Sequence, residues 1–283
     1  MHALRVILVA LGLLGAWHLQ AAAQADAQGA RVAFVVGNAA YPQADPPLAS
    51  TLADAAAVAG ELRRQGFAVD SGENLSKAEL VARTERLLAE VRPGATVAFY
   101  FSGYGIQAGR QNYLIPTDAN IWSETDIQRD GLNLSQLIGA ISGRGAAAAF
   151  IIVEGANRNP YERRFRSYST GLAPLGSLPP GVTVILSAAP GMSLRPPSGP
   201  RSPFSTELVK QMAAHGRLST ETLERTRTAV SASGGGLQVP WILSGRRELE
   251  ETPKVATLPQ PAVPRPPEPA PRPVAPAPPE PAP

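Results

Sequence analysis

Residues 31–37 read Arg-Val-Ala-Phe-Val-Val-Gly, an almost uninterrupted apolar run. Such a run is typical of a strand that is buried on both faces of a parallel sheet. Similar strand-like segments recur along the chain, at 67–71, 95–102, 147–154 and 182–188. Helix-like segments separate these strands. Repeated β-α-β units imply right-handed crossovers between parallel strands. The sequence therefore predicts the α/β class, as a three-layer α/β/α sandwich with a mainly parallel sheet.

Five segments have the spacing of apolar residues that indicates a helix. The clearest begins at Ser76, which forms a capping-box pattern with Glu79, and it ends before Pro93. The others are 54–65, 134–142, 203–214 and 219–233. Ligands of open parallel sheets bind beyond the carboxyl ends of the strands. We therefore look for a functional site just after the strands that end near residues 101, 154 and 188.

Composition excludes several kinds of chemistry. The 283 residues include no cysteine, which excludes disulfides and every mechanism with a cysteine nucleophile. Apart from His2 and His18, which lie within residues 1–25, the only histidine is His215, so we expect no metal site and no cofactor. Two of the three net positive charges come from the two ends of the chain, so the middle is close to neutral, which argues against a nucleic-acid partner.

Both ends of the chain differ from its middle. Residues 1–25 combine Arg5, an apolar run and Ala-x-Ala cleavage choices, which predicts a signal peptide. An uncleaved anchor is the alternative, but the apolar run at 6–17 is shorter than the roughly 20 residues that a span needs. We therefore expect no integral membrane span after cleavage and a periplasmic or secreted location.

Residues 252–283 hold 14 of the 29 prolines. A segment of this composition prefers the extended polyproline II conformation and cannot bury a hydrophobic core. The sequence therefore predicts a disordered tail. This tail is a spacer, a ligand for a proline-binding partner, or only a solubilising segment. The remaining residues, 26–251, are enough for one well-buried core and are predicted to form one domain.

Short turns that contain glycine follow three of the predicted strands. They are Ser102-Gly103-Tyr104-Gly105, Glu154-Gly155-Ala156-Asn157 and Ala188-Ala189-Pro190-Gly191. Taken alone, such turns are also what a chain needs in order to leave a sheet, so they do not identify a site.

With these turns, the chain resembles the caspase-like cysteine peptidases, in particular the bacterial metacaspase or orthocaspase type. The resemblance covers nearly all of 31–245, and its motifs keep their order and spacing. Besides the turns, the matching text includes Arg31 to Asn38, Ala53-Asp54-Ala55, Asn112 to Ala119, Asn157 to Pro160, Ser202-Pro203-Phe204 and Gln238 to Trp241. The family implies a caspase-like sandwich fold.

The resemblance also implies that the catalytic dyad is lost. Active members carry a histidine after the third strand and a cysteine after the fourth, where this chain has Tyr104 and Ala156. A phenol with a pKa of about 10 is a poor base at neutral pH, and a methyl group is no nucleophile. Ser102 and Ser187 are nearby hydroxyls, but His215 near a predicted helix end is too remote to act as their base. Gly103 resembles part of the oxyanion-binding region, which stabilises nothing without a nucleophile.

Substrate binding is the function that the resemblance leaves open. In relatives that cleave after Arg or Lys, acidic residues at the positions of Asp54 and Glu154 line the pocket for the basic side chain. Two carboxylates can hold a guanidinium through charge-assisted hydrogen bonds. The alternative is a purely structural pair, because Glu154 is one methylene longer than the usual Asp.

Three functional hypotheses follow. The first is a pseudopeptidase that acts as a non-catalytic binding or regulatory module, with basic peptides or an active peptidase as its partner. The second is a caspase-family peptidase with residual or noncanonical hydrolase activity. The third is a structural envelope scaffold.

Overall fold

The computed structural model describes residues 29–42, 48–161, 171–194, 197, 199–234 and 236–245. The predicted signal peptide and the predicted proline-rich tail lie outside these residues. A six-stranded sheet forms the centre of the fold, in the order β2-β1-β3-β7-β8-β9. Its strands are β1 (Arg31–Gly37), β2 (Ala68–Glu73), β3 (Thr96–Ser102), β7 (Ala148–Glu154), β8 (Val182–Leu186) and β9 (Trp241–Ser244). All pairs are parallel except β8 with β9.

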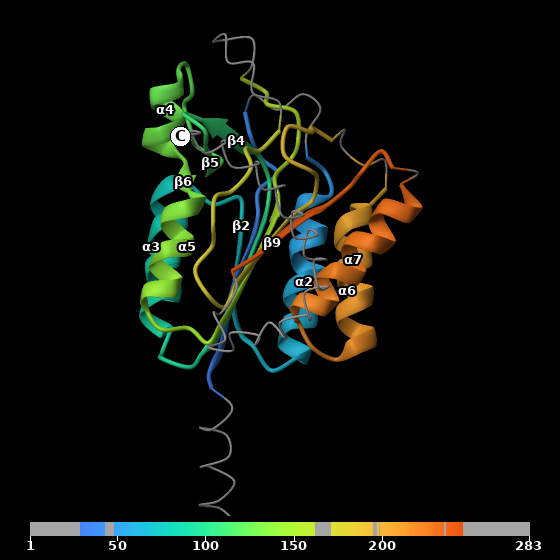
Figure 1. The fold of residues 1–283 in the computed structure, drawn as a ribbon. Helices are drawn as coiled ribbons and strands as arrows, with labels where there is room; N and C mark the ends of the chain where they lie inside the picture. The colour runs from blue at the N-terminus through green and yellow to red at the C-terminus, as the bar shows by residue number, and fades with distance from the viewer. Residues whose placement is uncertain are drawn as a thin grey trace, which may run out of the picture. The chain divides into compact units, whose positions relative to one another are not determined.

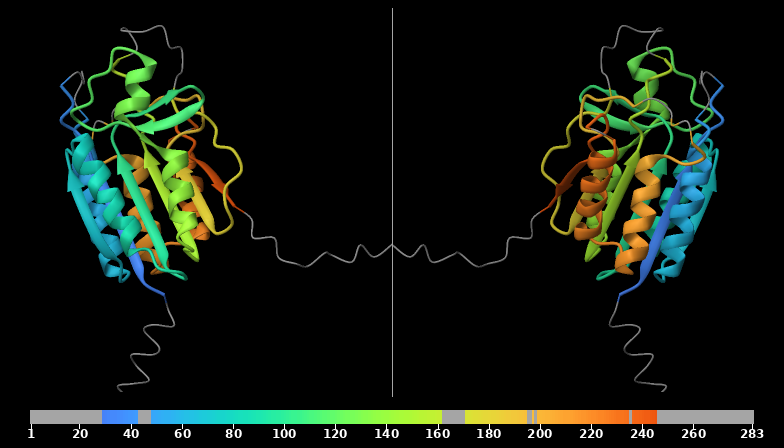
Figure 2. Two further views of the ribbon diagram at one scale, coloured as in Figure 1. Left: turned by 90° about the vertical axis from the view of Figure 1, so that its left-hand side faces the viewer. Right: turned by 90° about the vertical axis from the view of Figure 1, so that its right-hand side faces the viewer.

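Helices cover both faces of this sheet (Figures 1 and 2). On one face, α3 (Lys77–Glu90) and α5 (Leu134–Gly143) pack leucines and isoleucines onto β1, β3 and β7. On the other face lie α2 (Thr51–Arg64), α6 (Pro203–His215) and α7 (Thr220–Ser233). The predicted three-layer α/β/α fold with a mainly parallel sheet is therefore confirmed.

The apolar runs form the most deeply buried strands because they receive side chains from both helical layers. In β1, every residue after Arg31 is buried, and β7 follows the same pattern after Ala148. The capping box of α3 is also confirmed, since the Glu79 amide donates to the Ser76 hydroxyl and the Ser76 amide donates to the Glu79 carboxylate.

A second, three-stranded antiparallel sheet follows β3 directly and was not predicted. It contains β4 (Gly105–Ala108), β5 (Gln111–Leu114) and β6 (Leu132–Asn133), with α4 (Glu124–Asp130) packed beside it. Gly109 and Arg110 both have positive φ, 55° and 64°, which is the backbone of a two-residue hairpin turn. This sheet covers a third buried cluster, which includes Tyr41, Tyr104 and Tyr161.

The described residues contain neither a candidate membrane span nor a candidate metal cluster. No helix among them is long and apolar enough to cross a membrane. Within the same ranges, no group of three or more His, Cys, Asp or Glu side chains is placed to hold a metal ion.

Candidate functional site

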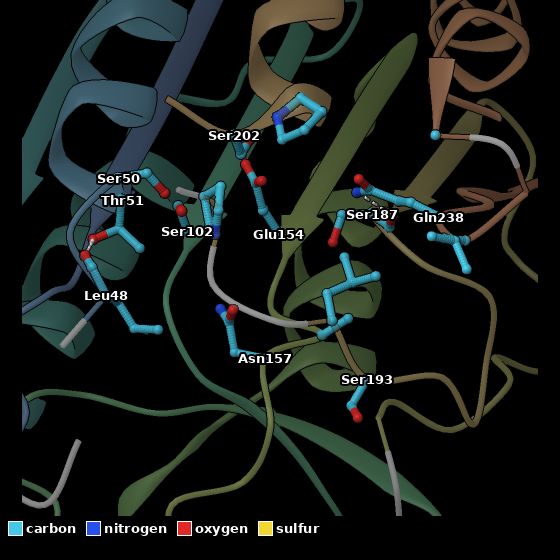
Figure 3. Close-up of a pocket in the computed structure, with 16 residues that line it drawn as sticks. Leu48, Ser50, Thr51, Ser102, Glu154, Asn157, Ser187, Ser193, Ser202 and Gln238 are labelled. Atoms are coloured by element: carbon cyan, nitrogen blue, oxygen red, sulfur yellow. Dashed lines mark hydrogen bonds between the residues drawn. The ribbon is translucent and has the colours of Figure 1, made fainter. Parts of the chain in front are cut away.

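A cavity of about 550 Å³ lies where β3, β7 and β8 end (Figure 3). This is the edge of the sheet at which the sequence predicted a site. Its walls include the N-termini of α2 and α6, contributed by Thr51 and Ser202. Its floor contains Ser102, Glu154 and Ser187, one from the end of each strand.

Strand register explains why these three side chains lie side by side. Ser102 pairs with Glu154 across β3 and β7. The Ser187 amide donates to the Val153 carbonyl at 2.9 Å, which continues the β7–β8 register to the next position. Paired residues of parallel strands point to the same face of the sheet. Figure 3 shows Glu154 between the two serines, with its carboxyl group directed toward Ser202.

Glu154 is a buried acid whose side chain is only 8% exposed. Its Oε2 accepts a hydrogen bond of 2.8 Å from the Tyr100 hydroxyl. Burial, followed by the nearby negative charge of Asp54, raises the pKa of Glu154 to about 8. At neutral pH the empty cavity therefore presents mainly a protonated carboxyl group.

Asp54 lies behind the cavity wall and is completely buried. Its Oδ1 accepts a hydrogen bond of 2.9 Å from the Ser202 amide and a second one from the Ser205 hydroxyl. Burial raises the pKa of Asp54, and these hydrogen bonds oppose the rise. The structure thus brings the two predicted acids together, but Glu154 faces the cavity whereas Asp54 holds the start of α6 against α2.

Tyr104 and Ala156, the two positions at which the family resemblance implies a lost dyad, are joined by an antiparallel β-bridge. Ala156 lines the cavity. The Tyr104 ring packs edge-to-face on Tyr41, with 4.7 Å between the ring centroids, and only 4% of Tyr104 is exposed. Because burial raises the pKa of the Tyr104 phenol, the phenolate that could accept a proton is even less populated at neutral pH than in a free phenol.

Backbone donors around Tyr104 are also occupied. The Gly103 amide donates to the Glu154 carbonyl at 3.2 Å, and the Gly105 amide donates to the Gly155 carbonyl at 2.9 Å. Gly103, which resembles part of an oxyanion-binding region, therefore has its N–H directed to another partner. This geometry does not provide a ready site for a tetrahedral oxyanion.

His215 is remote from the cavity. It ends α6, where Gly216 adopts φ 64° as the C-cap. The N-terminus of the same helix lines the cavity, and its 13 residues separate the two ends by about 18 Å. His215 therefore cannot act as a base for a hydroxyl in this cavity.

Some residues of the site were not found by sequence reasoning. Tyr100 lies within an apolar strand, where the pattern predicts a core residue. Gln238 begins a family motif that implies no role for it, and Leu237 precedes that motif. Ser202 offered a signal, because a serine before Pro203 is typical of a helix N-cap. The hydroxyls of Ser102 and Ser187 are buried and have no hydrogen-bond partner among the described residues.

Comparisons with known proteins agree with this geometry. The profile of the caspase domain family, Peptidase C14, matches residues 30–249. A search of curated proteins gave no match. Among solved structures, the chain is similar to the crystal structure of protein GSU0716 from Geobacter sulfurreducens, with a TM-score of 0.56 and 14% identity. That match covers 78% of this chain and 95% of the other, and it concerns the fold alone.

Proposed function

The chain belongs to the caspase domain family, and from this premise we propose that it is a non-catalytic member that binds a basic side chain of a peptide in its strand-end cavity. The observation that carries the proposal is Glu154. It is the only Asp, Glu, Lys, Arg or His among the described residues that line the cavity. A site with one acid and several hydroxyls favours a cationic ligand that donates hydrogen bonds.

The absence of catalysis is supported by the chemistry at the former dyad. The chain has no cysteine at all, and Ala156 stands beside the cavity where the nucleophile of the family belongs. Tyr104 is buried against Tyr41 and does not reach the cavity. A hydrolase mechanism through Ser102 or Ser187 needs a base, and His215 lies at the far end of α6.

Glu154 suits a guanidinium or ammonium group because its charge can appear when the ligand arrives. In the empty cavity, burial favours the neutral acid. A cation within hydrogen-bond distance favours the carboxylate, so binding releases the proton. Ser193, an exposed residue of the cavity lining, supplies a further acceptor for the N–H groups of the ligand.

The test is a calorimetric titration of the chain with an arginine-containing peptide and with its neutral citrulline twin. We expect micromolar binding of the arginine peptide, and binding at least tenfold weaker for the citrulline peptide or for the Glu154→Gln variant. Glu73→Gln is the matched control, because Glu73 ends β2 as Glu154 ends β7 but is exposed. Equal affinity for the two peptides would contradict the proposal. Cleavage of the arginine peptide would show a hydrolase instead.

The proposed location is outside the cytoplasm. It is supported by the signal-peptide pattern of residues 1–25, and the proline-rich residues 252–283 are proposed as a spacer or partner segment. Fractionation of cells that express the full chain tests the location. Recovery of the chain at its uncleaved mass from the cytoplasm would overturn it.

A further inference from the structure

One large aromatic side chain is exposed outside the strand-end cavity. Trp122 is 62% exposed and lies directly before α4. Figure 1 shows α4 near one end of α3 and α5, with α2, α6 and α7 on the opposite side of the six-stranded sheet. The cavity includes the N-termini of α2 and α6, and Trp122 is not one of the described residues that line it. A role of Trp122 is therefore separate from that of Glu154.

A tryptophan at this position often has an ordinary structural role. The residue before a helix N-cap commonly packs on the fourth residue of the helix, in a hydrophobic staple. Here Ser123 is the N-cap and the fourth residue is Ile127, which is completely buried. Ile127 lies in the third buried cluster together with Ile121, the neighbour of Trp122. Ile121 therefore makes the apolar contact with the cluster, while most of the indole of Trp122 stays at the surface.

Hydrogen bonds from both the ring and the backbone hold Trp122 in place. Its Nε1 donates to Asn120 Oδ1 at 2.8 Å, and its backbone amide donates to Asp126 Oδ2 at 3.1 Å. Arg129 joins Asp126 to Asp130, and the Asp130 carboxylate accepts from the Asn120 amide at 3.4 Å. A side chain that is fixed before a partner arrives loses little conformational entropy on binding. Trp122 is therefore a preorganised contact that offers the face of its ring.

The segment around Trp122 is acidic, although the chain as a whole is basic. Residues 116–131 contain one base and four acids, which gives a net charge of −3, whereas the whole chain has +3. The acids are Asp118, Glu124, Asp126 and Asp130. Asp118 and Glu124 are exposed. An indole face beside exposed carboxylates attracts a cation, both through the ring quadrupole and through the Coulomb interaction.

From this arrangement we propose that Trp122 is the centre of an interaction surface for a second protein. The partner presents a basic segment, in which one arginine or lysine side chain stacks on the indole and neighbouring cations face Asp118 and Glu124. Tryptophan is the aromatic residue that attracts cations most strongly, and it is enriched among the residues that dominate protein interfaces. This inference does not depend on the proposed function, because Trp122 and these two acids lie outside the cavity.

The test measures the binding of a fluorescent peptide of alternating arginine and glycine by anisotropy, with its citrulline twin for comparison. Every chain in the series carries Glu154→Gln, which removes the acid of the cavity and so separates this surface from the proposed function. Trp122→Ser is expected to weaken binding of the arginine peptide about fivefold, and Trp122→Phe, which keeps a ring, about twofold. Glu124→Gln should weaken it about threefold. The citrulline peptide should bind the parent chain at least about fivefold more weakly.

Glu221→Gln is the matched control, because Glu221 is an exposed acid on α7, across the six-stranded sheet from α3 and α5. It should leave the affinity unchanged. If Trp122→Ser binds the arginine peptide as tightly as the parent chain, the surface is wrong and the cavity proposal is unaffected. If it weakens the arginine and citrulline peptides by the same factor, the ring binds an uncharged group and the basic partner is wrong. Circular dichroism checks that Trp122→Ser folds, and if it does not, Trp122→Phe and Glu124→Gln decide the question.

Discussion

Replacement of Glu154 by glutamine should change how the stability of the fold depends on pH. Glu154 is buried, and its pKa rises from an ordinary 4.5 to about 8 in the folded chain. The folded state therefore binds this proton more tightly than the unfolded state between these two pH values. The contribution of Glu154 to the unfolding free energy is fully present below about pH 4.5 and is lost as the pH rises through about 8.

The size of the effect follows from the two pKa values. They differ by about 3.5 units, and each unit is 1.36 kcal/mol, so full ionisation of Glu154 costs on the order of 5 kcal/mol of unfolding free energy. Glutamine cannot ionise, and its carbonyl oxygen can still accept from the Tyr100 hydroxyl that contacts Glu154. The variant should therefore lose this part of the pH dependence while keeping the fold.

Urea unfolding followed by circular dichroism, at steps of one pH unit from 5 to 9, measures the effect. The unfolding free energy of the wild type minus that of Glu154→Gln should decrease by several kcal/mol over this range. Glu73→Gln, at the exposed end of β2, should give a difference from the wild type that stays flat. A flat difference for Glu154→Gln as well would refute the assignment of a buried, protonated acid to the floor of the cavity.

Three further predictions concern the surroundings of the site. Asp54→Ala removes the acceptor of two buried hydrogen bonds at the start of α6, so urea unfolding should show a loss of about 2–4 kcal/mol, and an unchanged midpoint would contradict that role. Asp54→Asn removes the charge that helps to raise the pKa of Glu154, so the pH at which stability declines should move downward in the same titration. Tyr104→His combined with Ala156→Cys should give no hydrolysis of an arginine peptide, because position 104 faces Tyr41 rather than the cavity; measurable cleavage would show that only the side chains had been lost.

Sequence reasoning predicted the central sheet well because its strands carry a strong physical signal. A run such as 32–37 is apolar throughout only if both faces are covered, and the structure covers both. The start of α3 was predictable from Ser76 and Glu79, whose capping box is a local interaction. These features depend on near neighbours in the chain.

The small second sheet was not predicted because its short strands carry only a weak local signal. The strands β4, β5 and β6 have four, four and two residues, too few to display a period of two. The antiparallel strand β9 is similarly short, and its residues are only partly buried. Pairing with distant partners decides these elements, and such pairing leaves little trace in the local sequence.

The candidate site was predicted in its location but not in its arrangement. The turns after the strands indicated the correct edge of the sheet, and the family resemblance drew attention to Asp54 and Glu154. The different surroundings of these two acids depend on Ser202 and Ser205, which are more than 140 positions from Asp54 in the chain. The cavity likewise joins residues from segments as far apart as Leu48 and Leu237.

A basic group that binds at Glu154 should convert its carboxyl group into the carboxylate. Calorimetric titration with the arginine peptide at pH 7, in two buffers of different ionisation enthalpy, counts the protons released on binding. With a pKa of about 8 in the empty cavity, Glu154 should release about 0.9 proton per peptide bound, and Glu154→Gln should release none. Binding of the peptide to the wild type without proton release would contradict the account.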